Sequence, residues 1–304
     1  HRVDRRQRQM CIRDSVGTVV AIKEIGHAPP SVATIVVALL VAAIGFWLFV
    51  RRQRRLENPL LEFSIFLNPA FSAGVLAAAF AMFAIGGIQL VTTQRFQQVV
   101  GFSPLEAGLL VAVIAVGSLP TALLGGAFLH RVGLLALITG GLAVATGGVV
   151  VTVVGFQSSF GVLVLGLLVT GAGLGAAMSV ASTAIIGNVP VRRAGMAASL
   201  EEVSYEFGSL IAVSVLGSLL TAIYTASVVL PNGAPAAAGD GIAEALEAAQ
   251  GDAAIIQAAS TAFDSAYLVV MLVVAGVLAA AAVITGVLLR RYLPGTQSQL
   301  HSEH

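Results

Sequence analysis

Three glutamates near the start of a long apolar segment are the side chains of this sequence best placed to do chemistry. Glu201, Glu202 and Glu206 lie within residues 195–224, and the rest of that segment is uncharged. On a helix, Glu202 and Glu206 share a face, with Tyr205 one step round and Glu201 about a turn below Tyr205. Carboxylates at or inside the mouth of a membrane-spanning helix are unfavourable, which indicates a functional role.

The same glutamates also have an interpretation that needs no ligand. Ser199 and Glu202 match the spacing of a capping box, and acidic residues suit the positive end of a helix dipole. This interpretation covers Glu201 and Glu202 better than Glu206, which would lie one or two turns deeper in the helix. From the sequence, both interpretations stay open.

The composition places the chain among proteins that cross a lipid bilayer several times. Of its 304 residues, 57% are hydrophobic and only 10% are charged, which is too little charge to cover a water-soluble surface. We therefore expect an all-α polytopic membrane protein. The arginines form short clusters between apolar segments, without a basic face or interleaved aromatic residues, which argues against nucleic-acid binding.

The residue patterns of intramembrane enzymes and metal sites are missing from the sequence. Its one cysteine, Cys11, provides neither a disulfide framework nor a cysteine-based metal site. The predicted spans contain no paired histidines, no paired aspartates and no serine elbow. We expect a protein that is not an enzyme and that carries no metal or other cofactor.

Seven apolar segments are long enough to span a bilayer, which requires about 20 residues per helix. A shorter apolar stretch at 16–22 is interpreted as the end of a preceding helix. The predicted spans are residues 31–50, 70–93, 104–129, 133–155, 160–187, 195–224 and 264–289.

The distribution of basic residues predicts the orientation. With 51–55 in the cytoplasm and the sides alternating, the outer segments hold only Lys23 and Arg95, as the positive-inside rule requires. The predicted location is the plasma (cytoplasmic) membrane, with the polar tail 294–304 inside the cell. The cytoplasmic arginines are Arg51, Arg52, Arg54, Arg55, Arg131, Arg192, Arg193, Arg290 and Arg291.

Two stretches outside the spans have their own patterns. Residues 228–263 form a long outer loop, in which the Ala-rich stretch 240–259 is typical of a short amphipathic helix at the interface. Residues 1–15 are polar, and Met10 to Ser15 (MCIRDS) match the translation of a common sequencing-library adapter. We interpret 1–15 as a non-native segment fused to a truncated membrane protein.

Polar residues gather at the outer end of the span 70–93, where they either line a water-filled cavity or face the outer interface. They are Gln89, Thr92, Thr93, Gln94 and Gln97.

Three further patterns have structural interpretations. Gly171, Gly173 and Gly175 alternate inside a span and lack the preceding strand of a nucleotide-binding loop, so we expect close helix packing. Asp264, followed by a serine, is expected to cap the last span. His130 is interpreted as a loop residue rather than a proton relay.

Four segments, in this order, together resemble one family of transporters. They are RRQRRLENPLLEFSIFLNPAF, TQRFQQVVGFSPLEAG, GGAFLHRVG and NVPVRRAGMAASLEEVSYEFG. The chain from Val16 to about Tyr292 resembles the C-terminal part of a major facilitator superfamily drug:proton antiporter. It is similar to the fourteen-helix type, which exports quaternary ammonium compounds and other lipophilic cations. FSPLEAG at 102–108 and the acidic EEVSYEFG block are the more specific pieces.

The resemblance implies an arrangement of domains. Residues 16–56 would comprise the end of a first linker helix and a complete second linker helix. Residues 57–293 would be the C-terminal six-helix bundle of a major facilitator fold. An N-terminal six-helix half, absent from this sequence, would be its partner, because such transporters bind substrate near the midplane between two halves.

The resemblance also implies site residues. In similar pumps, acids at the positions of Glu201, Glu202 and Glu206 take part in cation recognition and proton coupling, and Tyr205 lies beside them. Some relatives carry an acid near the position of Ser118, so this serine is a candidate for cavity lining, as are Gln89 and Thr93. GGAFLHRVG is similar to the superfamily's G-x-x-x-D-R-x-G loop, with a histidine at the usual acid. The loop residues are Gly125, His130, Arg131 and Gly133.

The predicted function is proton-coupled antiport that exports lipophilic cationic drugs. A lipophilic cation and a proton would compete for the same carboxylates, and alternating access would convert that competition into antiport. A major facilitator exporter of a metabolite or other small molecule is one alternative, and a non-transporting membrane scaffold is another. The acids without a lysine or arginine at membrane depth favour a cation over an anion.

Overall fold

The computed structural model describes residues 40, 44–45, 47–48, 51 and 63–290. The chain divides into two compact units, His1–Phe63 and Ser64–His304, and the second contains the elements that concern the site. The predicted segment 1–15, nearly all of the predicted linker helices at 16–56 and the tail 294–304 lie outside the described residues.

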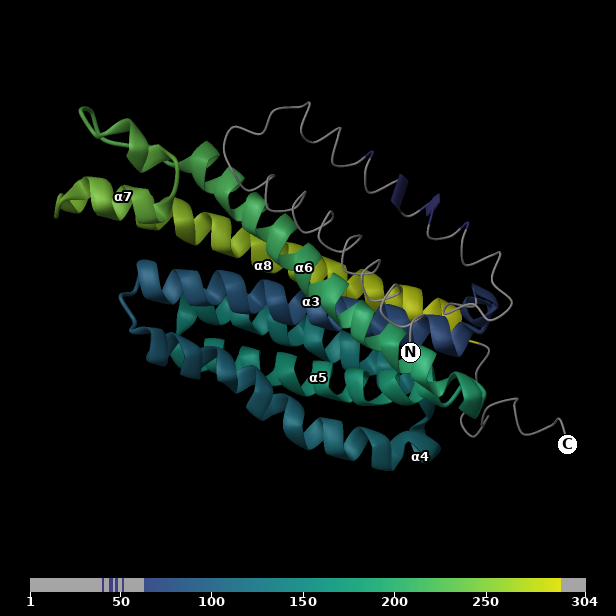
Figure 1. Cartoon of the computed structure of the whole chain (residues 1–304). Helices are drawn as coiled ribbons and strands as arrows, with labels where there is room; N and C mark the ends of the chain where they lie inside the picture. The colour runs from purple at the N-terminus through teal and green to yellow at the C-terminus, as the bar shows by residue number, and fades with distance from the viewer. Residues whose placement is uncertain (1–39, 41–43, 46, 49–50, 52–62, 291–304) are drawn as a thin grey trace, which may run out of the picture. The chain divides into compact units, whose positions relative to one another are not determined.

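The second unit is a bundle of long helices (Figure 1). The first of these long helices is labelled α3. The long helices are α3 (Pro69–Gln98), α4 (Pro104–Ser158), α5 (Phe160–Ile186), α6 (Ala194–Ser227) and α8 (Ala253–Leu289). The short ones are η1 (Phe63–Leu67), η2 (Val191–Arg193), η3 (Ala236–Gly239) and α7 (Ile242–Ala249). With α4 counted as two, the described residues contain 6 helices long and apolar enough to cross a membrane. The predicted all-α fold with a six-helix bundle is confirmed.

α4 consists of two segments that run in opposite directions. A straight helix of 55 residues would be about 80 Å long. Yet Phe102, just before α4, and Phe160, just after it, have ring centroids 6.3 Å apart. The chain reverses at Gly133, whose φ of 84° and ψ of 161° leave the helical region and favour glycine. The short turn expected between 104–129 and 133–155 lies at this residue.

Glycines hold α5 between the two segments of α4. A Cβ atom on Gly171 would overlap the carbonyl oxygen of Ile114, and one on Gly175 would overlap that of Ser118, both in the first segment. A Cβ on Gly173 would overlap backbone atoms of the second segment. Glycine at alternate positions therefore lets the backbone of α5 touch a neighbour on each side. The predicted packing role of these glycines is confirmed.

α6 packs mainly on α3, along one narrow stripe. Gly208 lies against the carbonyl of Ala79, and Leu216 lies against Gly87, so the two helices run parallel. The other faces of α6 are largely exposed. Its buried residues are Ala197, Leu200, Glu201, Ser204, Gly208, Ala212, Leu216, Leu220 and Tyr224.

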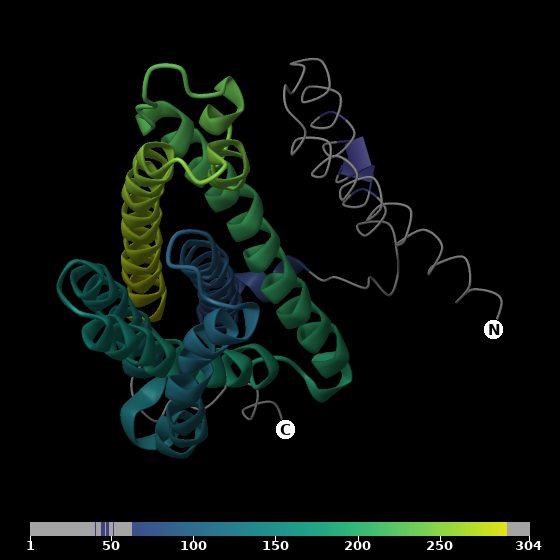
Figure 2. The same cartoon turned by 90° about the vertical axis from the view of Figure 1, so that its left-hand side faces the viewer.

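At one end of the bundle, the last turns of α6 and the first turns of α8 extend past α3 and α5 and meet α7 (Figure 1, Figure 2). There the hydroxyl of Tyr224 donates to the carbonyl of Ala238 over 3.0 Å, and Ile242 and Ala245 of α7 are buried. The stretch expected as an outer loop is thus a packed helical cap, and this end is called the α7 end below.

α8 begins at Ala253, eleven residues before the expected start of the last span. Its N-cap is Asp252, whose carboxylate accepts the N–H of Ala254 over 2.9 Å. The expected amphipathic helix at 240–259 is divided in two, because Gln250 and Gly251 have positive φ. The prediction that Asp264 caps a helix is wrong, since it lies inside α8.

Candidate functional site

The three glutamates lie inside α6, beyond its first turn. The helix starts at Ala194, and its N-cap, Arg193, makes no side-chain capping bond. Ser199 donates its hydroxyl to the carbonyl of Gly195 over 2.9 Å. The capping-box interpretation of Ser199 and Glu202 is therefore wrong, because by this point the backbone N–H groups already have partners within the helix.

Glu201 and Tyr205 form a hydrogen-bonded pair on the buried side of α6. The Tyr205 hydroxyl donates to Glu201 Oε1 over 2.6 Å. Glu201 is only 8% exposed and belongs to the stripe that faces α3. The two residues meet because positions four apart on a helix are neighbours. The sequence placed Glu201 about a turn below Tyr205, and the hydrogen bond joins these two positions.

Glu202 and Glu206 lie on an exposed part of α6. Their spacing places both carboxylates on one side of the helix, where like charges repel each other. No other described residue forms an ion pair or a hydrogen bond with either of them. Apolar side chains that are also exposed surround the two acids: Val203, Phe207 and Leu210. Uncompensated negative charge among apolar side chains suits a ligand that is both cationic and lipophilic.

The predicted cavity-lining residues lie apart from the glutamates. Gln89 is exposed and Thr93 is half-buried on α3. Because α3 and α6 run parallel, Gln89 lies about 15 Å farther along the bundle than Glu206. Ser118 lies on α4, where its hydroxyl donates to a carbonyl of its own helix over 2.9 Å. A cavity shared by these residues and the glutamates stays a prediction.

The predicted loop motif spans the reversal of α4. Gly125 is buried against α5, where Ser179 donates its hydroxyl across to the carbonyl of Ala122 over 2.8 Å. His130 and Arg131 are exposed just before the turn at Gly133. Neither side chain bonds to another residue in the described part of the chain.

An ion pair at the α7 end was missed by the sequence analysis. Arg95 Nε donates to Asp264 Oδ1 over 2.9 Å and joins α3 to α8. Within 63–290 it is the one ion pair between side chains. The partners are 169 residues apart, so local spacing could not pair them. The one sequence feature that could have indicated this ion pair is Arg95 itself, a lone arginine in a segment predicted to lie on the outer side.

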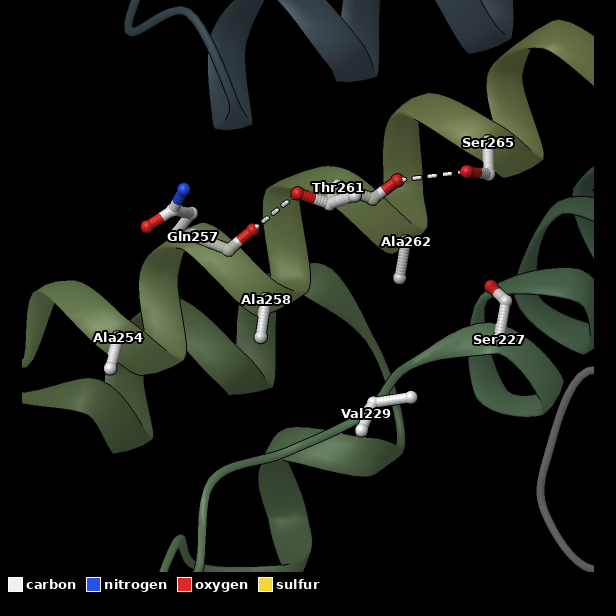
Figure 3. Close-up of a pocket in the computed structure, with 8 residues that line it drawn as sticks. All are labelled: Ser227, Val229, Ala254, Gln257, Ala258, Thr261, Ala262 and Ser265. Carbon is white, nitrogen blue, oxygen red and sulfur yellow. Dashed lines mark hydrogen bonds between the residues drawn. The ribbon is translucent and has the colours of Figure 1, made fainter.

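A groove of about 390 Å³ also lies at the α7 end, between the end of α6, the loop that follows it and the start of α8 (Figure 3). Its lining includes Ser227, Thr261 and Ser265, and each hydroxyl donates to a carbonyl of its own helix. No charged side chain lines this groove. It therefore offers no charge to balance a cation, unlike the exposed face of α6.

Comparison with known proteins gives one protein family and several similar proteins. Residues 74–239 match the Major Facilitator Superfamily. The chain is 28% identical over 286 residues to the multidrug efflux pump LfrA of Mycolicibacterium smegmatis, covering 90% of this chain and 56% of LfrA. It is 31% identical over 198 residues to the multidrug resistance protein Stp of Mycobacterium tuberculosis, covering 65% and 37%. It is 29% identical over 200 residues to the methyl viologen resistance protein SmvA of Salmonella typhimurium, covering 64% and 40%.

The chain thus spans roughly half, or less, of the length of these curated relatives. Among solved structures, it is similar to a bacterial homologue of the human lysosomal transporter Spinster in its inward-facing, occupied conformation. The TM-score is 0.61 at 19% identity, over 90% of this chain and 62% of the other. At that identity, the likeness concerns the fold alone.

Proposed function

Because the chain belongs to the Major Facilitator Superfamily, we propose that it is part of a proton-coupled antiporter that exports lipophilic cationic drugs. The observation that carries this proposal is the exposed pair Glu202 and Glu206 on α6, surrounded by apolar side chains and without a basic partner. The names of the relatives LfrA, Stp and SmvA support drug export. Membership of a transporter family also agrees with a multi-pass membrane protein that is not an enzyme.

In this proposal, the two acids on α6 bind either a cation or a proton. A carboxylate pair that has lost water contact favours neutralisation, and both ligands provide it. The exposed face of α6 would border a cavity shared with an N-terminal six-helix half, and exchange of the two ligands on opposite sides of the membrane would give antiport.

Glu201 has a different role in the same proposal. Its carboxylate is buried and already accepts the Tyr205 hydroxyl, so a bulky cation cannot reach it without moving α6 away from α3. We assign Glu201 to proton binding and Tyr205 to holding its carboxylate in place. The positive-inside pattern supports an outward position for the α7 end and a location in the plasma membrane.

The test uses the full-length gene in cells that lack their own ethidium pumps. Cells loaded with ethidium should export it when energised, and a protonophore that collapses the proton gradient should stop the export. Membrane insertion is checked by surface labelling. Export that persists without the gradient would contradict proton coupling, and no export from an inserted protein would favour a metabolite as the substrate.

A further inference from the structure

The ion pair at the α7 end is the centre of a cluster that joins three helices. The Arg95 guanidinium carbon lies 4.3 Å from the ring centre of Phe156 on α4, 5.0 Å from Phe96 on α3 and 5.7 Å from Tyr267 on α8. The side chain of Arg95 is 14% exposed and that of Asp264 is 32% exposed. The arginine is thus largely enclosed by aromatic rings, and its acidic partner still reaches solvent.

This cluster contains hydrogen-bonding groups without partners. An arginine has five N–H donors, and one of them, at Nε, bonds to Asp264. Three nearby oxygen atoms are buried and have no hydrogen-bond partner: Thr92 Oγ1, Gln98 Oε1 and Tyr267 Oη. The side chains of Thr92 and Tyr267 are fully buried and face each other, yet their hydroxyls do not reach hydrogen-bond geometry.

The three oxygen atoms lie where the guanidinium could reach them. Thr92 and Gln98 are one turn before and one turn after Arg95 on α3, and therefore share its side of the helix. Tyr267 is one turn beyond Asp264 on α8, with its ring already near the guanidinium.

A fixed structural contact between α3 and α8, called a strut below, does not account for this arrangement. Buried polar atoms in folded proteins nearly always have partners, and an unpaired one destabilises the fold. Apolar side chains of similar volume would join α3 to α8 at least as well as a partly buried ion pair. The guanidinium of Arg95 has N–H donors that Asp264 does not use, and they lie beside the three unpaired oxygen atoms. These groups give Arg95 a second position in which its side chain could form hydrogen bonds.

We propose that Arg95 is a two-position latch between α3 and α8. In the first position it pairs with Asp264, as in this structure. In the second it leaves Asp264 and donates to Thr92, Gln98 and Tyr267, which releases the α7 end of α8 from its charged contact with α3. A proton that binds the Asp264 carboxylate from solvent drives the change, because a neutral acid no longer holds the guanidinium.

No other charge competes in this exchange among the described residues. The end of α4 contributes Phe156, and the start of α5 contributes Phe160, whose ring lies 6.0 Å from that of Phe96. Besides Arg95 and Asp264, the described parts of these helices carry Glu106 at this end, and its carboxylate accepts the N–H and the hydroxyl of Ser103 over 2.8 Å. Arg131 lies at the other end of α4, near Gly133. The use of the latch in a transport cycle rests on the proposed function, whereas the two positions of Arg95 do not.

The test measures how often the contact between α3 and α8 opens. Ala266, fully buried on α8 between Asp264 and Tyr267, is replaced by cysteine in the full-length protein after every other cysteine has been replaced by serine. The rate of labelling by a water-soluble maleimide is measured in detergent at one fixed pH. Ala262, also buried on α8, provides a second reporter position if the first variant is unstable.

Two sets of substitutions distinguish a latch from a strut. Asp264→Asn mimics the protonated acid and should raise the labelling rate at least fivefold. Thr92→Val with Tyr267→Phe removes most of the second position while the ion pair stays, and should lower the labelling rate at least threefold without lowering the melting temperature. Asp252→Asn is the matched control, because it neutralises an acid of α8 where asparagine caps equally well, and it should label like the parent.

Labelling of the Thr92→Val, Tyr267→Phe protein at the parent rate would overturn the proposal, since a strut does not use those hydroxyls. An unchanged rate in Asp264→Asn would overturn it as well. The assay needs no drug and no gradient, so a failure of ethidium export would leave its result unaffected.

Discussion

α5 and α6 are both long apolar helices, but they are placed differently in the bundle. In the apolar stretch of α5 that could cross a membrane, 50% of the residues are buried, whereas 28% are buried in the corresponding stretch of η2 and α6. α5 is uncharged and touches both segments of α4 through glycines. α6 touches α3 along one stripe and carries Glu201, Glu202 and Glu206.

This difference indicates a division of roles within the bundle. α5 contributes shape, since its backbone must approach two neighbours at once and has no room for a Cβ. α6 contributes side-chain chemistry on a face that the bundle leaves open. We therefore expect substitutions in α5 to change the free energy of unfolding, and substitutions of the acids in α6 to change transport at nearly constant stability.

The largest effect is expected for Gly171→Ala in α5. The new Cβ would overlap the carbonyl oxygen of Ile114, and backbone cannot rotate away as a side chain can. Such overpacking should lower the free energy of unfolding by about 3 kcal/mol, measured as the melting temperature of the full-length protein in detergent.

Gly147→Ala is the matched control for this substitution, because a Cβ at Gly147 would have nothing within 4 Å. This helical position should gain roughly 0.5–1 kcal/mol from the better helix former. Equal melting temperatures for the two alanine variants would contradict the role assigned to α5.

For Glu206→Gln in α6, we expect a smaller change in the free energy of unfolding but a large change in export. Loss of one carboxylate of the exposed pair should reduce gradient-driven ethidium export at least tenfold, equivalent to about 1.4 kcal/mol. The melting temperature should stay the same, because no described residue bonds to this side chain. Glu247→Gln, an exposed glutamate of α7, should export like the parent, and a parallel loss in both variants would argue against a specific site.

The smallest effect is expected for Tyr205→Phe. It removes the hydrogen bond to Glu201 but keeps the ring, and one hydrogen bond to a charged group contributes about 1.5–3 kcal/mol. Export should fall two- to fivefold, with a changed pH profile, because the variant lacks the hydroxyl that holds the Glu201 carboxylate in place. Tyr224→Phe removes a bond within the α7 cap and should lower the melting temperature while the pH profile stays the same. A pH profile unchanged by Tyr205→Phe would separate Tyr205 from proton binding.

The sequence predicted the helical fold well because long apolar segments leave few alternatives in a membrane. The spans that the structure describes, the turn near His130 and the packing of Gly171, Gly173 and Gly175 all follow from local composition. Helix starts were less predictable, since apolar content does not mark where a helix emerges from the membrane. α8 therefore starts at Ala253, capped by Asp252, rather than at Asp264.

The placement of the candidate site residues could be predicted only in part, because local spacing does not show what lies across from a helix. The sequence placed the three glutamates and Tyr205 on one helix, as in α6. It could not show that Glu201 is buried on the side that faces α3 while Glu202 and Glu206 are exposed. Arg95 and Asp264 meet only through the tertiary fold.

The central claim is that a cation and a proton compete for Glu202 and Glu206. The most direct measurement adds tetraphenylphosphonium to the purified full-length protein in weakly buffered solution and follows proton release with a pH indicator. The account predicts release by the parent and none by the Glu202→Gln, Glu206→Gln variant. Release of the same size by that variant, or cation binding to the parent without release, would contradict it.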